Sequence, residues 1–592
     1  MQSVLEILPT EIWFDIFDYL TVLDIFYAFA RLNQRLNDLL GVYPLRLDFR
    51  QLSRTQFDFL CQCIQGKQVL SLCLSDELIP NQVQIFNRYF PHFDQQFRQL
   101  RTLKYVDTLT VLPRLPPSLS FLSIKTYLQT IETISLINEL LRQHSQLSLT
   151  TLHIDGAYVF QTIDYSFPFL TYLTIDYCTI KEFRRILHSL KSPLTHLTIF
   201  LDQNDRLALP SFEQLSTTLL KLNVTFSEGK SPLSPFISLS LNLISEIVTS
   251  FTAIKLWLKD LSHLNSLTLQ STVISNMIDG QQWEEFLLQT NIQDFNFKFF
   301  LVHPPDDETC FLQSFRSPFW LAKTHWYVVC ERGKFRSSRP LIYSLPYFQS
   351  TCIFHPSNHI RSQSIDRNAP CISSHSIHLI LTSYESIPSS TIFFSKVFEL
   401  TLMTTTLPSV EHLQSMMNLE EIQRLDVSLV KTFSSDLFHL LIQEMNNLKV
   451  IKMQYNPFYI PPLHIYSYIF IRNDQEVSVV DANNLERFLY LFFHLKFLEI
   501  TIQSEEILIQ LLNRLHYLET IRIYSYNNYL LRIDSRWLRG NIRRLKMMDF
   551  TFRATSTSLL IAIGNVKLKT KQSTMKVRGR RLIKSCLPCQ IQ

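Results

Sequence analysis

Cysteine and histidine residues gather between positions 352 and 378, where their side chains could ligate a metal ion. The cluster consists of Cys352, His355, His359, Cys371, His375 and His378. Structural zinc sites use closely spaced ligand pairs that bring four ligands to one ion in tetrahedral geometry. The spacings in this cluster fit no such arrangement. We therefore predict a polar loop in this region and no metal site.

Other signatures of catalysis are weak or missing. Cys586 and Cys589 form a CxxC pair, but neither a second pair nor a βαβ pattern surrounds it, so a redox role is not predicted. The nine glycines lie too far apart for the glycine-rich loops that cradle phosphates, and the HExxH motif of zinc proteases is missing. The sequence predicts no catalytic residue, no cofactor and no metal, so we expect a protein that is not an enzyme.

Positive charge is concentrated near the C-terminal end. The chain has a formal net charge of +5, and residues 551–592 contain nine Lys or Arg and no Asp or Glu, which leaves −4 on the first 550 residues. A nearly neutral body gives no sign of nucleic-acid binding, and we expect none. We predict a disordered basic tail at 551–592, with a nuclear-import or polyanion-binding segment as the alternative.

Several features indicate an intracellular protein that is not in a membrane. Glu6 and four further acidic residues precede the first basic residue, Arg31, which is the reverse of the charge order in a signal peptide. The uncharged run from Met453 to Ile471 contains three prolines and would be a poor membrane span. Ten dispersed cysteines do not form a disulfide scaffold. We expect the cytoplasm, with the nucleus as the alternative because of the basic tail.

The first forty residues carry a dense apolar pattern. Residues with the i, i+3, i+4, i+7 spacing of one helical face are Trp13, Ile16, Phe17 and Leu20. Residues 21–24 fit a capping box that starts a second helix, and leucines at 36–40 indicate a third. So small a core leaves surplus apolar surface, which needs a partner. That partner is either another protein or the following domain, which the helices would then cap.

These residues resemble an F-box. The family pattern LPxEIxxxIFxYLxxxDL is matched by 8–12, 16–20 and 23–25, within a segment that covers residues 5–41. F-box proteins bind the Skp-type adaptor of Skp–cullin–F-box ubiquitin ligases, and the rest of such a chain selects the substrate. The resemblance therefore implies an adaptor-binding surface that consists of Leu8, Pro9, Ile12, Ile16, Phe17, Leu20 and Asp24. The chain departs from the pattern in the third helix, where residues 31–35 lack the common tryptophan.

A second pattern, apolar-x-x-apolar-x-apolar, recurs through most of the chain. Copies begin at positions 100, 119, 149, 170, 194, 219, 264 and 292, then at 397, 422, 448, 495, 518 and 542, with weaker copies at 42 and 69. Adjacent spacings are mostly 19–30 residues, and the steps of 45 and 47 suggest one degenerate repeat each. A period of roughly 20–29 residues is typical of a leucine-rich-repeat solenoid. The copy at 170–180 resembles the repeat LxxLxLxx[NC]xL, with Cys178 at the ladder position.

We therefore predict an α/β protein that consists of an N-terminal three-helix F-box and an irregular leucine-rich-repeat solenoid, a horseshoe, with an insertion. The expected segments are the F-box at 1–48, a first repeat arc at 49–302, an insertion or hinge at 303–396, a second arc at 397–550 and the basic tail at 551–592. Within the insertion, residues 325–329 and 341–343 fit two strands of a β-hairpin. An unrelated α/β domain with apolar strands is the alternative.

The repeats also indicate where a target protein would bind. Because side chains alternate along a strand, the apolar positions of each copy point into the core and the x positions point away from it. A solenoid aligns such positions into one surface, and we predict a target site there that includes Tyr172, Asp176, His196, Arg522, Tyr524, Arg544 and Lys546. The cations of this set favour an acidic or phosphorylated target.

The expected function is that of a substrate-recognition adaptor. The F-box would dock on the Skp-type adaptor of a cullin ligase, and the repeats would hold a protein substrate that the sequence does not identify. A leucine-rich-repeat binding scaffold without ligase function is the alternative.

Overall fold

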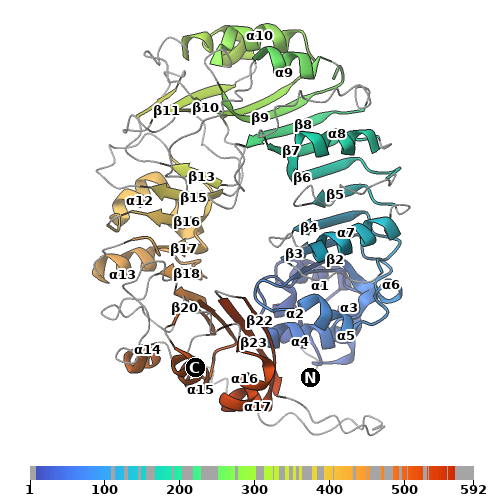
Figure 1. Cartoon of the computed structure of the whole chain (residues 1–592), viewed down its shortest axis with the longest axis vertical. Coiled ribbons are helices and arrows are strands. Elements are labelled where there is room, and N and C mark those ends of the chain that lie inside the picture. Colours follow the sequence, from blue (N-terminus) through green and yellow to red (C-terminus); the bar gives the residue numbers. More distant parts are fainter. Residues whose placement is uncertain are drawn as a thin grey trace.

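The computed structural model describes most of the chain between residues 8 and 566. The described residues are 8–107, 114–125, 131–144, 148–154, 167–189, 193–202, 218–227, 251–259, 261–273, 278–301, 312–323, 326–332, 340–345, 351–354, 359–362, 377–382, 393–404, 406–430, 435–448, 450–453, 468–471, 485–491, 496–502, 504–524, 530, 532–555 and 558–566. They form an α/β protein with two large, mostly parallel sheets (Figure 1).

Three short helices come first: α1 (Thr10–Asp18), α2 (Val22–Phe29) and α3 (Gln34–Val42). Local capping sets where they begin. The Thr21 side chain accepts a hydrogen bond from the amide of Asp24, and the Asn33 side chain accepts one from the amide of Leu36. Both caps satisfy amides that the first turn of a helix leaves without partners. The prediction of three short N-terminal helices is confirmed.

The first sheet has thirteen strands, and ten of them follow one another in sequence order with parallel pairing. Its far end is antiparallel, in the order β10-β12-β11-β14. The strands are β1 (Leu45–Asp48), β2 (Val69–Ser75), β3 (Thr102–Val106), β4 (Phe121–Lys125), β5 (Thr151–Ile154), β6 (Tyr172–Thr179), β7 (His196–Asp202), β8 (Lys221–Ser227), β9 (Ser266–Val273), β10 (Asp294–Leu301), β11 (Tyr327–Arg332), β12 (Leu341–Leu345) and β14 (His359–Ser362).

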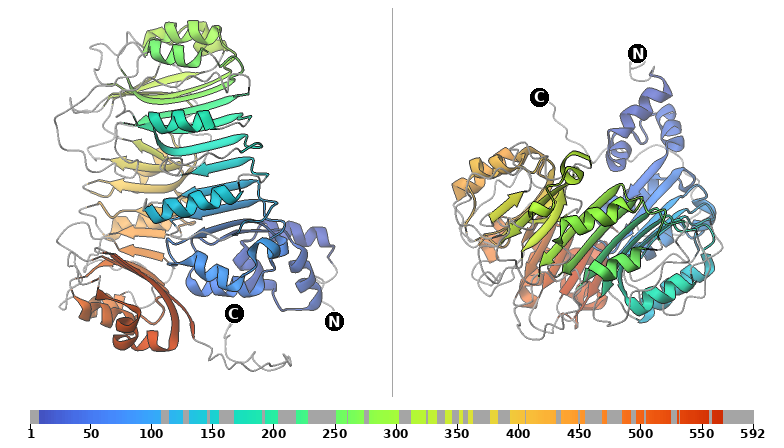
Figure 2. Two further views of the ribbon diagram at one scale, coloured as in Figure 1. Left: turned by 45° about the vertical axis from the view of Figure 1, so that its right-hand side comes forward. Right: turned by 90° about the horizontal axis from the view of Figure 1, so that it is seen from above.

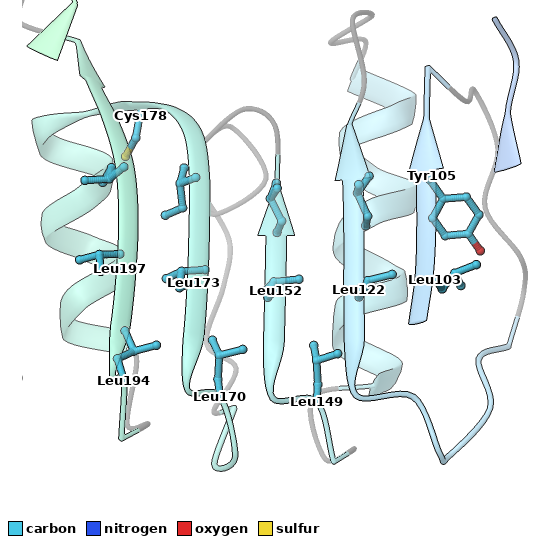
Figure 3. Packing of buried hydrophobic residues seen from close by; sticks show 14 of the residues in the cluster. Leu103, Tyr105, Leu122, Leu149, Leu152, Leu170, Leu173, Cys178, Leu194 and Leu197 are labelled. Carbon is cyan, nitrogen blue, oxygen red and sulfur yellow. The ribbon is translucent and has the colours of Figure 1, made fainter. Parts of the chain in front are cut away.

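Helices cover one face of this sheet and leave the other face open (Figure 1). The intervening helices are α4 (Arg54–Cys63), η2 (Gly66–Gln68), α5 (Gln82–Tyr89), α6 (Phe93–Gln96), α7 (Ile131–His144), α8 (Ile180–Ser189), α9 (Phe251–Leu258), α10 (Gly280–Leu288) and the short π-helix η6 (Phe319–Lys323). The covered face is leucine-rich. Leu152, Leu173 and Leu197 are neighbours in register and are fully buried, as Figure 3 shows. Each such side chain contributes about 1.5–3 kcal/mol by leaving water.

The second sheet has ten strands, in the order β13-β15-β16-β17-β18-β19-β20-β21-β23-β22. Its strands are β13 (Thr351–Phe354), β15 (Ile377–Thr382), β16 (Val397–Met403), β17 (Arg424–Asp426), β18 (Val450–Met453), β19 (Tyr468–Ile471), β20 (Phe497–Thr501), β21 (Thr520–Tyr524), β22 (Met548–Ala554) and β23 (Ser558–Val566). Its helices are α12 (Val410–Met416), η7 (Leu419–Glu421), α13 (Ser435–Glu444), α14 (Leu485–Leu491), α15 (Glu505–Arg514), α16 (Ser535–Asn541) and α17 (Arg543–Met547). Pairing is parallel up to β21 and antiparallel in β21-β23-β22.

The recurring pattern apolar-x-x-apolar-x-apolar, which we call the apolar phrase, coincides with a strand at almost every copy. Most of these strands begin two residues after the phrase begins. The copy at 542 is the exception, because residues 543–547 are helical. Ile542 and Leu545 are both fully buried, and their spacing of three suits one side of a helical turn as well as a strand. The 47 residues between the copies at 448 and 495 contain the strand β19, where one degenerate repeat was predicted. Across the step of 45, β8 pairs directly with β9, so no strand lies between these two in the sheet.

The described strands of residues 303–396 belong to the two sheets and do not form a separate unit. β11 and β12 pair in antiparallel fashion, which confirms the predicted hairpin, and β12 also pairs with β10. The described strands β13 and β15 belong to the second sheet. The hairpin contributes to both cores, since Val328 and Cys330 pack in the first and Val329 and Tyr343 in the second. Because side chains alternate along a strand, one face of this hairpin packs against the first core and the other face packs against the second.

The expected start of a basic tail at residue 551 is wrong. β22 continues to Ala554, and β23 spans Ser558–Val566. Leu559, Ile561 and Ile563 of β23 are buried, and this alternation is that of a strand with one face in the core. Eight of the nine basic residues counted in the tail follow residue 566, outside the described ranges.

The last strands lie against the first helices, so the chain follows a closed course (Figure 1). Arg54 Nη2 of α4 lies 3.1 Å from Asp549 Oδ2, and Arg553 Nη2 lies 3.1 Å from Asp107 Oδ2. A Cβ atom at Gly564 would lie 3.1 Å from Arg54 Cγ and 3.3 Å from the Asp549 carbonyl oxygen. The missing side chain of Gly564 therefore allows β23 to approach α4. We call these contacts the closing seam.

A buried ion pair lies beneath the closing seam. Arg54 Nε is 3.0 Å from Asp58 Oδ2, and the two side chains are only 4% and 6% exposed. The Tyr89 hydroxyl also donates to Asp58, at 3.1 Å. Burial raises the pKa of the Asp58 carboxyl, while the Arg54 guanidinium acts in the opposite direction. The carboxylate therefore depends on its two donors to remain charged inside the protein.

Replacing Arg54 by Met is expected to lower the free energy of unfolding by about 3–5 kcal/mol, because it leaves a buried carboxylate without its cation. The loss should shrink at acid pH. In the variant, the Asp58 carboxyl has a higher pKa in the folded state than in the unfolded state. As the pH falls through that pKa, the folded protein binds the proton first, so its free energy of unfolding increases. Urea denaturation at neutral pH and at about pH 4.5, near the range where ordinary carboxyls titrate, measures both effects.

Arg50→Met is the matched control for this substitution. The Arg50–Asp48 pair is half exposed, at 51% and 50%, and exposed pairs contribute about 0–1 kcal/mol. Equal losses for Arg54→Met and Arg50→Met would contradict the importance of the buried pair.

Reversing the charge of Arg553 is expected to open the closing seam. Arg553→Glu places a carboxylate against Asp107, and amide exchange should accelerate in β22 and β23. Adding Asp107→Lys should restore much of the protection. The exposed Arg514–Glu486 pair between α15 and α14 is the control, since Arg514→Glu should leave exchange in β22 and β23 unchanged. Exchange that Arg553→Glu does not alter would show that apolar contacts alone hold the seam.

Candidate functional site

Helix α1 is apolar on two sides, and its inner side forms the core of the N-terminal helices. Trp13 and Phe17 on that side are 2% and 0% exposed. The ring of Phe17 lies 5.1 Å from the ring of Tyr43 and 5.5 Å from the ring of Phe29, between centroids. The prediction that Phe17 contacts an adaptor is therefore wrong in this structure, because the side chain is enclosed by its own chain.

The opposite side of α1 is exposed, and we call it the outer α1 face: Pro9, Ile12, Ile16, Tyr19 and Leu20. Ile12 is 42% exposed, Tyr19 91% and Leu20 37%, whereas Ile16 is half-buried. Pro9, Ile12, Ile16 and Tyr19 are separated by three, four and three residues, the spacing of one helical stripe. Tyr19 is absent from the predicted adaptor-binding set, although its position seven residues after Ile12 places it on this stripe.

Side-chain hydrogen bonds hold α1 in place. Arg35 of α3 donates to the carbonyl oxygen of Leu8, whose side chain is half-buried. The Tyr43 hydroxyl donates to Asp18 Oδ1 at 2.6 Å. Burial and this hydrogen bond raise the pKa of Tyr43 to about 12, so the phenol remains a donor at neutral pH. The segment that lacks the family tryptophan thus supplies, through Arg35, an anchor for the start of α1.

Asp24 is exposed, as an adaptor contact requires, but it also has a structural role. The Thr21 hydroxyl donates to Asp24 Oδ2 at 2.6 Å while accepting from the Asp24 amide at 3.2 Å. This reciprocal arrangement caps α2. Figure 2 shows the three N-terminal helices beside the sheets, at one margin of the molecule.

The second candidate surface is the face of the first sheet that no helix covers. Its side chains form two rows across β4 to β10, and we call them the polar face. The first row consists of Phe121, Thr151, Tyr172, His196, Lys221, Ser266 and Asp294. The second row consists of Ser123, His153, Thr174, Thr198, Asn223, Thr268 and Asn296. These are the third and fifth positions of the apolar phrase, so the sequence pattern sets the register.

Three of the predicted residues, Tyr172, His196 and Asp176, contact neighbours on the polar face. The rings of Tyr172 and His196 stack, with centroids 4.1 Å apart and planes at 22°. His153 Nε2 lies 2.8 Å from Asp176 Oδ2. Tyr172 remains 44% exposed, so its ring is accessible to a ligand. Asp176, in contrast, already has a partner within the chain.

The electrostatic surroundings of His196 favour its neutral form. Burial lowers the pKa of His196, and the neighbouring Lys221 lowers it further. The Thr195 hydroxyl lies 2.9 Å from His196 Nδ1. Neutral imidazole can stack on Tyr172 without the cost of burying a charge. At neutral pH this part of the polar face is therefore aromatic and polar, with Lys221 as its cation.

Arg522, one of the cations predicted in the second arc, is used within the chain. Arg522 lies 3.5 Å from Glu499 and donates to the carbonyl oxygen of Glu77 at 2.6 Å. The Tyr524 hydroxyl donates to Glu499 at 3.1 Å. Burial, and then the charge of Glu499, raise the pKa of Tyr524. Arg522 thus belongs to the closing seam and is not an unoccupied cation for an acidic target.

Arg544 and Lys546 are on α17 and not on a strand, contrary to the prediction. The Arg544 guanidinium donates to the carbonyl oxygen of Leu515 at 2.9 Å, while Lys546 is exposed. Arg522, Arg544 and Lys546 therefore do not form one row on a sheet, and the expected acidic-target site at this end has no support in the geometry.

Among the described residues, no cluster of His, Cys, Asp or Glu has the arrangement of a metal site. Cys352 and His378 lie on neighbouring strands, but Cys352 is paired in register with Leu379 and its thiol is buried, which raises its pKa to about 12. His378 Nε2 lies 2.8 Å from the Thr401 hydroxyl. The members His355, Cys371 and His375, and the Cys586–Cys589 pair, lie outside the described ranges. In the described part, no helix combines the length and apolarity needed to cross a membrane.

The pKa of His196 can be tested directly. NMR titration of the imidazole is expected to give a pKa below the ordinary value of about 6.5. Lys221→Gln should raise the His196 pKa by removing a nearby positive charge, but not fully to the ordinary value, because burial still disfavours the imidazolium. Lys298→Gln is the control, as this lysine lies on β10, three strands away. An unchanged pKa in Lys221→Gln would refute the electrostatic part of this account.

Comparison with known proteins adds no family to these observations. No family model matches the chain, and no curated protein matches it. The functional argument therefore depends on the outer α1 face and the polar face.

Proposed function

We propose that this chain is the substrate-recognition subunit of a Skp–cullin–F-box ubiquitin ligase. The outer α1 face carries the proposal. Its residues Ile12, Tyr19 and Leu20 remain exposed although the helix already buries Trp13 and Phe17 on its other side. Apolar side chains grouped on an otherwise folded helix are typical of a protein-binding surface. The same helix carries the sequence that resembles an F-box.

We further propose that the sheets are an irregular leucine-rich-repeat solenoid. Strands at the recurring phrase, parallel pairing in sequence order and helices on one face all support this proposal. In such an arrangement each unit packs its leucines against its neighbours and presents its x positions on one continuous surface. The antiparallel strands at the ends of both sheets are departures from a regular repeat.

The polar face is the proposed site for the target protein. It offers the exposed ring of Tyr172 and the cation of Lys221, surrounded by hydroxyl and amide side chains such as Thr174 and Asn223. Aromatic anchors in a polar surrounding are typical of protein interfaces. In this proposal the chain supplies no catalytic group and needs no cofactor, because its role is to hold the target near the ligase.

A binding scaffold without ligase function is the second candidate. It is favoured by the packing of α2, whose residues Ile25 and Phe26 are buried in the same cluster as Leu45 and Leu47 of β1. A helical unit with this packing would serve as a cap that shields the first strand from water. The cap alone, however, gives no reason for the exposure of Ile12 and Tyr19.

Binding to a purified Skp-type adaptor tests the ligase proposal. The full chain should bind the adaptor, and Ile12→Asp combined with Tyr19→Asp should weaken binding at least about 100-fold, since losing buried anchors costs about 2–4 kcal/mol. Leu256→Asp is the matched control, because Leu256 is 66% exposed on α9, at the other end of the molecule in Figure 1. Biolayer interferometry gives the affinities, and circular dichroism checks that each variant is folded.

Two outcomes would contradict the ligase proposal. An unmodified chain that does not bind the adaptor would leave the scaffold as the better explanation. Equal weakening by Leu256→Asp would place the contact elsewhere. Phe17→Ala is not suitable as a probe, because truncating this buried ring should destabilise the helical unit by about 3–5 kcal/mol and mimic a loss of binding.

A further inference from the structure

Strand β1 is at the end of the first sheet and pairs only with β2 among the described strands. The amide of Phe49 donates to the carbonyl oxygen of Cys73 at 3.1 Å, which fixes the direction of the backbone groups. Successive residues of a strand direct their N–H and C=O groups to opposite sides, so Arg46 and Asp48 direct theirs away from β2. No other described strand pairs with β1, so the sheet does not use these groups.

A groove of about 990 Å³ lies beside β1, between this strand and the connection from α1 to α2. Its lining includes residues 43, 44 and 46–52 and most of residues 17–25. Leu20, Val22 and Leu23 form part of the helical wall, and Pro44 and Leu52 flank the strand. A volume of this order, within the range of about 300–1,000 Å³ for ligand sites, has room for a short extended segment.

The charges around the groove are unevenly matched. Asp48 pairs with Arg50, at 2.6 Å, and Asp18 accepts from the Tyr43 hydroxyl at 2.6 Å. Arg46 is exposed and has no carboxylate partner among the described residues. The acidic groups of the groove are thus already satisfied within the chain, while one cation is not. An acidic side chain opposite Arg46 would give this cation a carboxylate partner.

We propose that the edge of β1 binds an extended acidic segment of a partner protein as an added strand. The main chain of the segment would pair with the backbone groups of Arg46 and Asp48. Its apolar side chains would enter the groove, and an acidic side chain would contact Arg46. Open strand edges recruit extended chains in this way, with backbone hydrogen bonds giving affinity and side-chain pockets giving specificity. The proposal does not depend on the ligase role, because it uses backbone groups that the outer α1 face does not include.

An eight-residue, fluorescein-labelled peptide that alternates valine and glutamate tests the proposal with the full chain. Fluorescence anisotropy should show saturable binding. The same peptide with N-methyl groups on alternate residues cannot pair along one edge, and it should bind at least about tenfold more weakly, as expected when backbone hydrogen bonds are lost. An octaglutamate peptide tests attraction by charge alone, and it should also bind at least about tenfold more weakly.

Two substitutions at one position separate backbone from side chain. Asp48→Pro removes an outward N–H, which an edge strand tolerates because that group does not pair with β2. Asp48→Ala removes the carboxylate and keeps the N–H. Both variants lose the carboxylate that pairs with Arg50, so they are compared with each other. Asp48→Pro should bind the peptide at least about tenfold more weakly than Asp48→Ala, since only the first loses a backbone donor. Arg46→Glu should weaken binding of the acidic peptide as well.

The opposite results would overturn the proposal. They are the absence of binding to the unmodified chain, equal binding of the N-methylated peptide, and equal binding of octaglutamate. If Asp48→Pro alters the circular dichroism spectrum, the comparison of plain and N-methylated peptides on the unmodified chain still decides.

Discussion

The two-residue alternation of side chains along parallel strands is the constraint on which this structure depends. At each copy of the apolar phrase it turns leucines such as Leu152 and Leu173 toward the helices and leaves the third and fifth positions on the opposite face. A shift of one residue in any strand would exchange the two faces and expose the leucines. The apolar core therefore fixes the register, and the register in turn aligns Tyr172 with His196. The arrangement of side chains on the polar face is a by-product of burying the other face.

Charged groups serve a different purpose where the first and last parts of the chain meet. The sheets are built by apolar packing, but the closing seam uses Arg54, Arg522 and Arg553, each bonded to an acceptor from the other end of the chain. Ion pairs and hydrogen bonds need defined geometry, whereas apolar surfaces tolerate sliding. The seam thus gives a unique alignment to two ends that apolar contact alone would leave free to shift.

The sequence predicted the local features well because they depend on neighbours in the chain. The N-terminal helices, the hairpin around Val329 and nearly all strands follow from periodicity and capping. The errors concern long-range contacts. Periodicity identified the apolar sides of α1 but not which one faces inward, and the family resemblance then assigned Phe17 to a partner. Arg522 was assigned to a ligand because its acceptor on Glu77 lies 445 residues away in sequence.

Two further predictions were wrong, one because of composition and one because of an ambiguous period. The excess of Lys and Arg over 551–592 concealed the alternation in β23, whose Ile561 and Ile563 are buried. The phrase at 542 fitted a strand and a helical turn equally, because Ile542 and Leu545 satisfy both periods. Tertiary context decides such cases, and a single sequence does not contain it. Ile12 and Leu20 of the outer α1 face are exposed, and their contact with an adaptor stays a prediction.

The closing seam also has a consequence for biosynthesis. Arg54 and Asp549 are separated by 495 residues, so a nascent chain makes one partner long before the other. Contacts of such sequence separation form late, since the loop between them must first be closed. The contacts among the N-terminal helices, such as those of Phe17 with Phe29 and Tyr43, join residues close in sequence and can therefore form early in translation. During translation the outer α1 face is therefore available before the molecule is complete, while the buried Asp58 waits for β23 to shield it from water.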